Sequence, residues 1–334
     1  MSSKSLKYIE VTGDPRQMGR EYGEAVRIEI LKNIEVFCAD VVVDTAVKQY
    51  LSQAFPEIFE EMTGIADGAN VPLDHVIAMN QWRGSVLDRS GCTPVCIRTD
   101  TGALVAKNND GTPGTEYEYV VRKSVPAKGL PMLQMTYAGW LSGLDAINAG
   151  GLANTHGSVG SVFQPPTPAV DVRLAVYALM RYEKRVTPFM EKLRALPLTG
   201  KGFNIVVGDR DGNTAVLEAA VPVVQSRNIN EPFVYATNHY VSEGLKQSDR
   251  RSPRGKEISR YRLGYLEWRA LTDPPSTLEG VRSLLQSHDP WAPCRHGGAH
   301  VSATEWSMIN VTAEGKTLIA IGSPCRNAYK EFFL

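Results

Sequence analysis

A cysteine directly follows a glycine where an apolar segment begins: Gly91 and Cys92 open the run GCTPVCIRTD. A thiol needs a base to become a nucleophilic thiolate, because the ordinary pKa of cysteine is about 8.5. If the peptide bond before Cys92 were cleaved, its own α-amino group, with an ordinary pKa near 8, would reach the sulfur. Gly91 suits such a cut because a residue without Cβ permits a strained backbone and leaves its carbonyl open. The pair predicts a self-activating nucleophile that forms a thioester, and the competing interpretation is a buried core cysteine.

The residues before this junction have helical periodicity. Asp14 followed by Pro15 is typical of a helix N-cap with proline at the first helical position. Apolar residues then recur at helical spacing: Met18, Tyr22, Val26, Ile30 and Ile34. A second helical segment lies within 54–70. Residues 1–91 are therefore expected to form a helical N-terminal segment.

Beyond Cys92 the pattern changes to strands joined by tight turns. Apolar segments flank DTG at 100–102, DG at 211–212 and AEG at 313–315, which is typical of hairpins. Helical segments return at 171–186, 257–271 and 276–287, the last opened by a capping box of Ser276 and Glu279. Helices followed by antiparallel strands predict an α+β fold with helical layers packed on sheets.

Composition limits the partners. Lys plus Arg and Asp plus Glu number 36 each in 334 residues, so no net charge attracts nucleic acid or an anionic membrane, and neither partner is expected. The first residues contain no apolar signal segment, which favours a cytoplasmic protein. An odd, sparse set of cysteines argues against a disulfide framework and predicts reduced thiols: Cys38, Cys92, Cys96, Cys294 and Cys325.

Several segments together resemble one family. The run GCTPVCIRTDTGALVAKNND is similar to the processing-site segment of the acyl-coenzyme A:6-aminopenicillanic acid acyltransferase (isopenicillin N acyltransferase-like) family of N-terminal nucleophile (Ntn) hydrolases. GDPRQMGREYG, GIADGANVPLDHVIAMNQWR, ATNHY and GSPCRNAYKEF also match, in the same order along nearly the whole chain. The resemblance implies a precursor that cleaves itself at a Gly-Cys junction.

The resemblance also implies roles for individual residues. Cys92 matches the family nucleophile and Gly91 the residue whose carbonyl is released. Asp110 matches the acidic residue beside the new N-terminus, and Asn238 matches an asparagine of the oxyanion hole. A carboxylate can hold the α-amino group and an amide can stabilise a tetrahedral intermediate, although turn or capping roles are the alternatives. His239 is expected to be a structural hydrogen-bond partner.

Two positions depart from the family pattern. An arginine shortly before an A-T segment is missing, since Ala303-Thr304 follows HVS at 300–302; Arg295 or a histidine is a candidate substitute. Pro94 stands where the fungal acyltransferase has a hydroxyl residue. A penicillin substrate is therefore not implied.

A zinc-binding module is the rival from another class. Cys92 and Cys96, with His296 and His300, formally satisfy zinc-ligand spacings. If residues 92–96 form a strand, however, the two cysteines stand ~13 Å apart, too far to share one ion. No metal site is therefore expected.

We expect a four-layer αββα Ntn-hydrolase sandwich with a helical N-terminal prosegment: residues 1–91 become the α chain and residues 92–334 the catalytic β chain, and the two stay associated. The predicted function is an amidohydrolase that cleaves a small N-acyl compound through an acyl-thioester, without a cofactor. An acyltransferase that moves an acyl group from acyl-CoA or an amide to an amine is the alternative, and a noncatalytic scaffold or zinc-binding protein is the second. Substrate-binding residues are unassigned, and homo-oligomerisation stays open.

Overall fold

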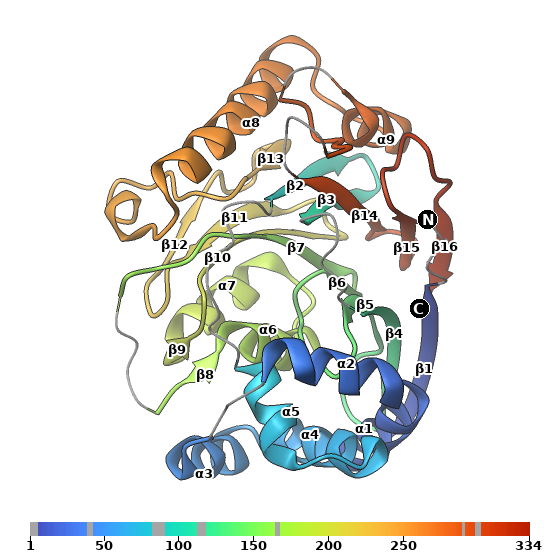
Figure 1. Ribbon diagram of the computed structural model, residues 1–334. Coiled ribbons are helices and arrows are strands. Elements are labelled where there is room, and N and C mark those ends of the chain that lie inside the picture. The colour runs from blue at the N-terminus through green and yellow to red at the C-terminus, as the bar shows by residue number, and fades with distance from the viewer. Residues whose placement is uncertain are drawn as a thin grey trace.

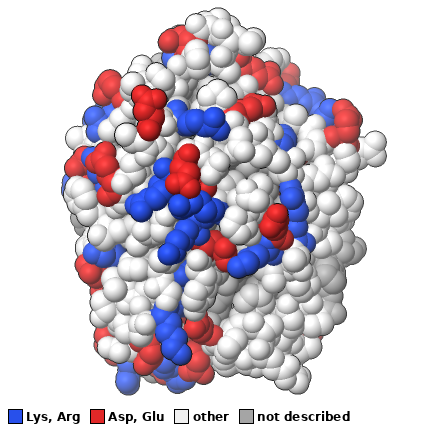
Figure 2. All heavy atoms as spheres, turned by 180° about the vertical axis from the view of Figure 1, so that it is seen from behind, with Lys and Arg blue, Asp and Glu red and all other residues white. Residues whose placement is uncertain are grey.

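The computed structural model describes residues 6–38, 43–81, 91–111, 118–163, 168–288, 291–297 and 302–334. Two β-sheets face each other, and helices cover the outer face of each (Figure 1). The layer order helix, sheet, sheet, helix confirms the predicted αββα sandwich. Basic and acidic side chains are interspersed on the face seen in Figure 2, in keeping with their equal numbers. No helix of the described segments is both long and apolar enough to cross a membrane.

The N-terminal segment is helical, as predicted. Its helices are α1 (Pro15–Ala25), α2 (Arg27–Phe37), α3 (Thr45–Ala54), α4 (Pro56–Ala69) and α5 (Leu73–Asn80). Asp14 caps α1 by accepting a hydrogen bond from the backbone N of Gln17 at 2.9 Å. One strand, β1 (Lys7–Gly13), precedes these helices and pairs in parallel with β4 (Tyr119–Pro126). Residues on both sides of the Gly91–Cys92 junction therefore share one sheet.

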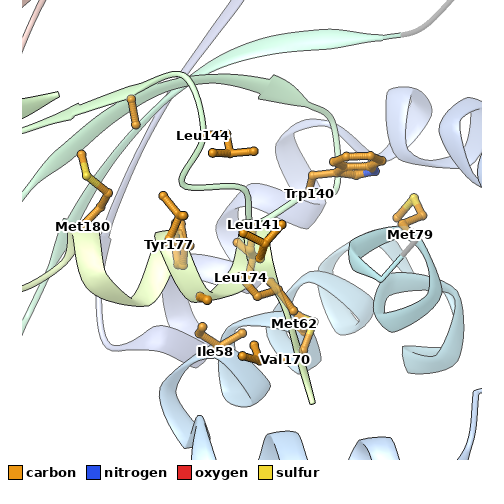
Figure 3. Packing of buried hydrophobic residues seen from close by; sticks show 14 of the residues in the cluster. Ile58, Met62, Met79, Trp140, Leu141, Leu144, Val170, Leu174, Tyr177 and Met180 are labelled. Carbon is orange, nitrogen blue, oxygen red and sulfur yellow. The ribbon is translucent and has the colours of Figure 1, made fainter. Parts of the chain in front are cut away.

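Glycines allow α1 and α4 to pack closely. A Cβ on Gly19 would lie 2.1 Å from the carbonyl oxygen of Glu61, and one on Gly64 would lie 2.2 Å from that of Arg16. Such distances are too short for any side chain, so only glycine permits this crossing. The glycines in GDPRQMGREYG and GIADGAN thus have a packing role. Figure 3 shows how Met62 of α4 packs near Leu174 of α6 (Val172–Met180) in the same core.

The larger sheet has eight strands in the order β1-β4-β5-β6-β7-β10-β11-β12. The remaining members are β5 (Met132–Tyr137), β6 (Ala146–Asn148), β7 (Leu152–Ser158), β10 (Phe203–Asp209), β11 (Thr214–Ala219) and β12 (Val224–Arg227). The short strands β8 (Val170–Asp171) and β9 (Leu198–Thr199) pair separately beside α7 (Val186–Ala195). Ile205 and Val207 of β10 contact the helical core, whereas Val206 contacts the core between the sheets.

The smaller sheet has six strands in the order β13-β2-β3-β14-β15-β16. They are β13 (Phe233–Tyr235), β2 (Gly91–Thr99), β3 (Gly102–Gly111), β14 (Ala303–Val311), β15 (Lys316–Ile321) and β16 (Lys330–Phe333). Helices α8 (Pro253–Thr272) and α9 (Leu278–Gln286) cover its outer face, and the 3-10 turn η1 (Lys246–Ser248) precedes them. All three predicted hairpin turns join paired strands.

Alternation along β2 decides where the thiol of Cys92 lies. Val95 and Ile97 pack toward the outer helices, whereas Cys96 packs in the core between the sheets. Side chains two residues apart share a face of a strand, so Cys92 lies on the same face as Cys96, between the two sheets. The fold therefore brings the first residues of β2 to the inter-sheet space.

Candidate active site

The thiol of Cys92 lies in a cavity at one end of the inter-sheet space. Cys92 pairs with Asn109 of β3, and its Sγ lies 3.5 Å from Asn109 Oδ1, to which the thiol donates. Asn109 in turn donates from Nδ2 to Glu305 Oε2 at 3.1 Å. Cys92 is only 6% exposed but lines the cavity, so its sulfur can meet a small ligand there.

Asn238 contacts the backbone nitrogen of this cysteine. Cys92 N donates to Asn238 Oδ1 at 2.8 Å, and Arg262 Nη2 donates to the same oxygen at 2.6 Å. The Nδ2 of Asn238 donates to the carbonyl oxygen of Ser158 at 2.9 Å. The amide oxygen, rather than the NH₂ group, thus holds the nitrogen that would become the α-amino group. One N–H of the NH₂ group is used by Ser158, so the oxyanion role predicted for Asn238 requires the other N–H as the donor.

Arg262 is a site residue that the sequence analysis did not identify. Its guanidinium donates to the carbonyl oxygen of Cys92, and at 3.2 Å to Thr93 Oγ1. Arg262 lies on the buried face of α8 with Ser259, Leu263 and Leu266, a spacing of three and four residues. Burial, and then repulsion from Arg295, lower the pKa of Arg262. An arginine at an apolar helical position was the signal in the sequence.

Asp110 lies directly beside the junction, in the place that the family resemblance implied. It pairs with Gly91, and its Oδ1 accepts a hydrogen bond from Thr304 Oγ1 at 2.9 Å. Its Oδ2 lies 3.6 Å from Arg295 Nε and has no hydrogen-bond partner among the described residues. Burial raises the pKa of Asp110, although Arg295 and Arg262 act to lower it. A buried carboxyl of this kind can exchange a proton with a nearby amine.

The space around Gly91 is limited. Gly91 lies in the regular pairing of β2 with β3. A Cβ there would lie 3.1 Å from Asp110 Oδ2 and 3.2 Å from Arg262 Nη2. Any side chain would therefore have to displace both charged groups by a few tenths of an ångström.

The cavity is small and has an apolar and a polar part. Its volume is about 120 Å³. Aromatic rings form much of its wall: Phe37, Tyr119, Tyr137, Trp140, Phe203 and Trp306. Lys201, in the loop before β10, also lines it, and burial together with Arg251 and Arg173 lowers the pKa of Lys201 to about 8. The cavity suits a compact apolar group with a polar end.

A buried charge cluster forms another part of the wall. Lys107 Nζ lies 3.0 Å from Asp145 Oδ2, and His156 Nδ1 lies 3.0 Å from the same oxygen. Despite its burial, the pKa of Asp145 is lowered by His156 and Lys107. Burial lowers the pKa of His156, which outweighs the opposite effect of Asp145. Lys107 and His156 thus meet at one carboxylate oxygen of Asp145 in the wall of the cavity.

The structure brings Cys92, Asp110 and Asn238 together around one junction. Of the rival zinc arrangement, His296 lies beside Cys294 and Cys325. Cys96 points into the inter-sheet core from the strand that it shares with Cys92. His300 and Val301 lie outside the described residues. Arg295, the other candidate substitute for the missing family arginine, forms an ion pair with Asp110. His239, which follows Asn238 in the chain, places its Nδ1 2.8 Å from Oγ of Ser259 in α8.

Comparisons with solved structures give distant similarities. A conjugated bile acid hydrolase from Clostridium perfringens is 11% identical with a TM-score of 0.45, covering 73% of this chain and 97% of that one. An N-acylethanolamine-hydrolyzing acid amidase (NAAA) ortholog from Caenorhabditis elegans is 13% identical with a TM-score of 0.47, covering 66% of this chain and 93% of that one. Penicillin V acylase from Agrobacterium tumefaciens is 12% identical with a TM-score of 0.41, covering 69% and 82%.

Sequence comparison is more informative. A curated relative from Emericella nidulans, the 40 kDa form of acyl-coenzyme A:6-aminopenicillanic-acid-acyltransferase, is 27% identical over 171 residues, which are 46% of this chain and 47% of the relative. The chain thus matches about half the length of that relative. The family model of acyl-coenzyme A:6-aminopenicillanic acid acyl-transferase matches residues 97–265, just over half of the chain, a range that includes Asp110, Asn238 and Arg262 but begins after Cys92. The predicted resemblance is confirmed, and the chain belongs to the acyl-coenzyme A:6-aminopenicillanic acid acyl-transferase family.

Proposed function

We propose that this chain is a cysteine Ntn amidohydrolase that activates itself by cleaving the bond between Gly91 and Cys92. Cys92 Sγ attacks the Gly91 carbonyl carbon, the C–N bond breaks, and the nitrogen takes up the thiol proton. Water then cleaves the thioester and leaves a carboxylate on Gly91 and a free amine on Cys92. The observation that carries this proposal is the 2.8 Å hydrogen bond from Cys92 N to Asn238 Oδ1, which holds the future amine beside a thiol that lines a cavity.

In the cleaved enzyme the α-amino group of Cys92 serves as the base. It accepts the thiol proton, the thiolate attacks the substrate amide carbonyl, and the same proton passes to the departing amine. Water resolves the acyl-thioester and releases a carboxylic acid. Asn238 and Arg262 orient the amine, and Asp110 stabilises its charged form from the side of Gly91.

The cavity favours a small substrate with an apolar acyl group. Its aromatic wall can bury the acyl chain, and Lys201 offers a positive charge to a polar or carboxylate group on the amine side. We propose small N-acyl compounds, such as N-acyl amino acids or N-acyl amines, as the substrate class. No step requires a cofactor.

The two chains of the cleaved protein would remain associated. Strand β1 pairs with β4 over residues 7–13 and 120–126. Glu61 of α4 is buried and accepts hydrogen bonds from Arg122, and at 2.8 Å from the Tyr177 hydroxyl. Separating residues 1–91 from 92–334 would expose this pair and the helical core, at a large cost in free energy.

The first experiment measures the mass and N-terminal sequences of the purified protein. We expect two chains, the larger beginning Cys-Thr-Pro, from the wild type and one intact chain from Cys92→Ala. Cys96→Ala, which alters a buried cysteine of the same strand, is the control and should be cleaved. Cys92→Ser should cleave slowly and show little turnover, since a hydroxyl is the weaker nucleophile. A folded wild type that stays intact after long incubation would favour the noncatalytic scaffold.

An acyltransferase is the second candidate function, because the curated relative carries that name. Both functions pass through the same acyl-thioester. They differ in whether an amine or water attacks that thioester faster. The test compares kcat/KM for hydrolysis of N-acyl amino acids and N-acyl amines with that for transfer from acyl-thioesters to added amines. We expect hydrolysis to dominate, with aminolysis only at high amine concentration. Efficient transfer from acyl-coenzyme A with negligible amide hydrolysis would reverse the assignment.

A further inference from the structure

Four metal-binding side chains meet at one place outside the cavity: His288, Cys294, His296 and Cys325. His288 follows α9, Cys294 and His296 lie in the segment 291–297 before β14, and Cys325 lies between β15 and β16. One potential ligand atom from each residue lies within 4.8 Å of those from the other three. His288, Cys294 and His296 lie within nine residues of one another, and Cys325 joins them from a separate part of the chain.

Four of the six distances between these atoms are close to the edges of a zinc tetrahedron. Zn–S bonds of ~2.3 Å and Zn–N bonds of ~2.05 Å imply edges of ~3.8 Å between sulfurs, ~3.6 Å between sulfur and nitrogen and ~3.3 Å between nitrogens. The two sulfurs lie 3.6 Å apart, and the two Nε2 atoms of His288 and His296 lie 3.0 Å apart. His296 Nε2 lies 3.8 Å from Cys294 Sγ and 3.4 Å from Cys325 Sγ.

A disulfide or a simple pair of histidines explains less. A disulfide bond is ~2.05 Å long, so the sulfurs at 3.6 Å are in non-bonded contact. A hydrogen bond between the histidines accounts for the nitrogen pair only. One tetrahedral ion accounts for both pairs and for the mixed contacts of His296 at once.

Ligand chemistry and charge favour zinc. Two thiolates and two imidazoles form a mixed sulfur and nitrogen set, which zinc accepts in closed, four-coordinate structural sites. Two thiolates neutralise the ion's double charge, so the bound site adds no net charge next to Arg295 and Arg326. We propose that His288, Cys294, His296 and Cys325 bind one zinc ion as a structural site. This departs from the expectation that the chain has no metal.

The site would anchor the segment that carries Arg295. Arg295 stands between two ligands and makes a 3.6 Å ion pair with Asp110. Its backbone N donates to Thr304 Oγ1 at 3.0 Å, and its carbonyl accepts from Ser323 Oγ at 3.0 Å. The ion would tie this segment to the end of α9 and to the turn before β16. Metal binding itself does not depend on the proposed enzymatic function.

The experiment measures zinc in full-length protein purified under reducing conditions without chelator. We expect about one zinc ion per chain, and a loss of more than about half of it in Cys294→Ser and in Cys325→Ser. Cys38→Ser, which alters a buried thiol outside the cluster, is the matched control and should retain zinc. Less than about 0.1 zinc per chain, or a disulfide between Cys294 and Cys325 in peptide maps, would overturn the proposal.

Two further measurements keep the result interpretable if the Cys294 variant fails to fold. Cobalt(II) added to chelator-treated wild type should give the visible absorption of a tetrahedral thiolate site, and Cys325→Ser, whose side chain is partly exposed, should not. Hydrogen exchange of residues 291–297 should accelerate after chelation and slow again with zinc but not with magnesium. Unchanged exchange in protein that does bind zinc would refute the anchoring role.

Discussion

The side-chain oxygen of Asn238 lies 2.8 Å from the backbone nitrogen of Cys92, and Arg262 Nη2 donates to the same oxygen. Both neighbours are donors, so only the oxygen of the amide satisfies them. Asn238 therefore binds the nitrogen of the nucleophile with one end and Ser158 with the other. A single side chain can thus serve the amine and, through its remaining N–H, an oxyanion.

Asn238→Asp and Asn238→Ala separate these two roles. Asp retains an oxygen for Cys92 N and Arg262 but loses the NH₂ donor, so we expect self-cleavage to continue while kcat falls about 100- to 1,000-fold. Ala should impair both cleavage and turnover. Cleavage is followed by mass spectrometry, and kcat is measured on the processed fraction. Asn148→Ala, which removes another buried amide that bonds Met180 and Glu183, should lower stability with kcat near normal.

Arg262→Gln tests the buried guanidinium at the junction. The variant loses charge-assisted hydrogen bonds to the Cys92 carbonyl and to Asn238 Oδ1, each worth ~1.5–3 kcal/mol. We expect self-cleavage to slow at least about tenfold, measured as the rate at which the intact chain disappears. Arg260→Gln alters an exposed arginine of the same helix and should cleave like the wild type. Equal rates for the two variants would remove Arg262 from the site.

Gly91→Ala tests whether space is the reason for glycine at the junction. The new Cβ would crowd Asp110 Oδ2 and Arg262 Nη2 at 3.1 and 3.2 Å, so we expect slower cleavage with the fold retained. Gly264→Ala is the control, because nothing lies within 4 Å of a Cβ there. That control should cleave normally and gain up to about 1 kcal/mol of stability, since alanine favours a helix. Unimpaired cleavage of Gly91→Ala would contradict the steric argument.

Local signals predicted the elements well. The Asp14 cap and the three hairpin turns appear in the structure. The place of Asp110 beside Gly91 also appears, but it was implied by the family resemblance rather than by a local signal. Periodicity did not reveal that the first helix breaks at Val26, because buried side chains continue at helical spacing across the break. The predicted capping box of Ser276 is wrong: Thr277 is the cap, and its Oγ1 accepts from Gly280 N at 3.1 Å.

Two arginines reach the site through long-range contacts, and sequence reasoning missed one of them, Arg262. Arg262 meets Cys92, and Arg295 meets Asp110, only because a helix and a loop from the C-terminal half cover the six-stranded sheet. The only sequence signal for Arg262 was its place at an apolar position of α8, which no motif marks. In the histidine and cysteine cluster, His288, Cys294 and His296 lie within nine residues of one another, but Cys325 joins them only through the fold. Spacing rules detect ligands that are neighbours along the chain, and they paired His296 with Cys92 and Cys96 instead of Cys294 and Cys325, whose sulfurs lie 3.8 and 3.4 Å from its Nε2.

The last prediction concerns acid. Burial, and then the charges of Arg260 and Arg262, lower the pKa of His239 to about 3, whereas an unfolded histidine has a pKa of about 6.5. Between these values the unfolded chain binds a proton that the folded chain does not, so stability must fall as pH decreases through this window. The slope from this one residue is at most about 1.4 kcal/mol per pH unit.

His239→Gln removes this titration while keeping a polar partner for Ser259. Denaturant unfolding at several pH values should therefore show a shallower loss of stability between pH ~6.5 and ~3 for the variant than for the wild type. The comparison is normalised at pH ~8, where the wild-type ring is neutral in both states, so any lost contact appears as a constant offset. Ser259 Oγ also accepts from Asn238 N at 2.7 Å, so charging His239 would disturb the loop that holds the nucleophile's nitrogen. Parallel slopes for variant and wild type would mean that another group causes the acid sensitivity.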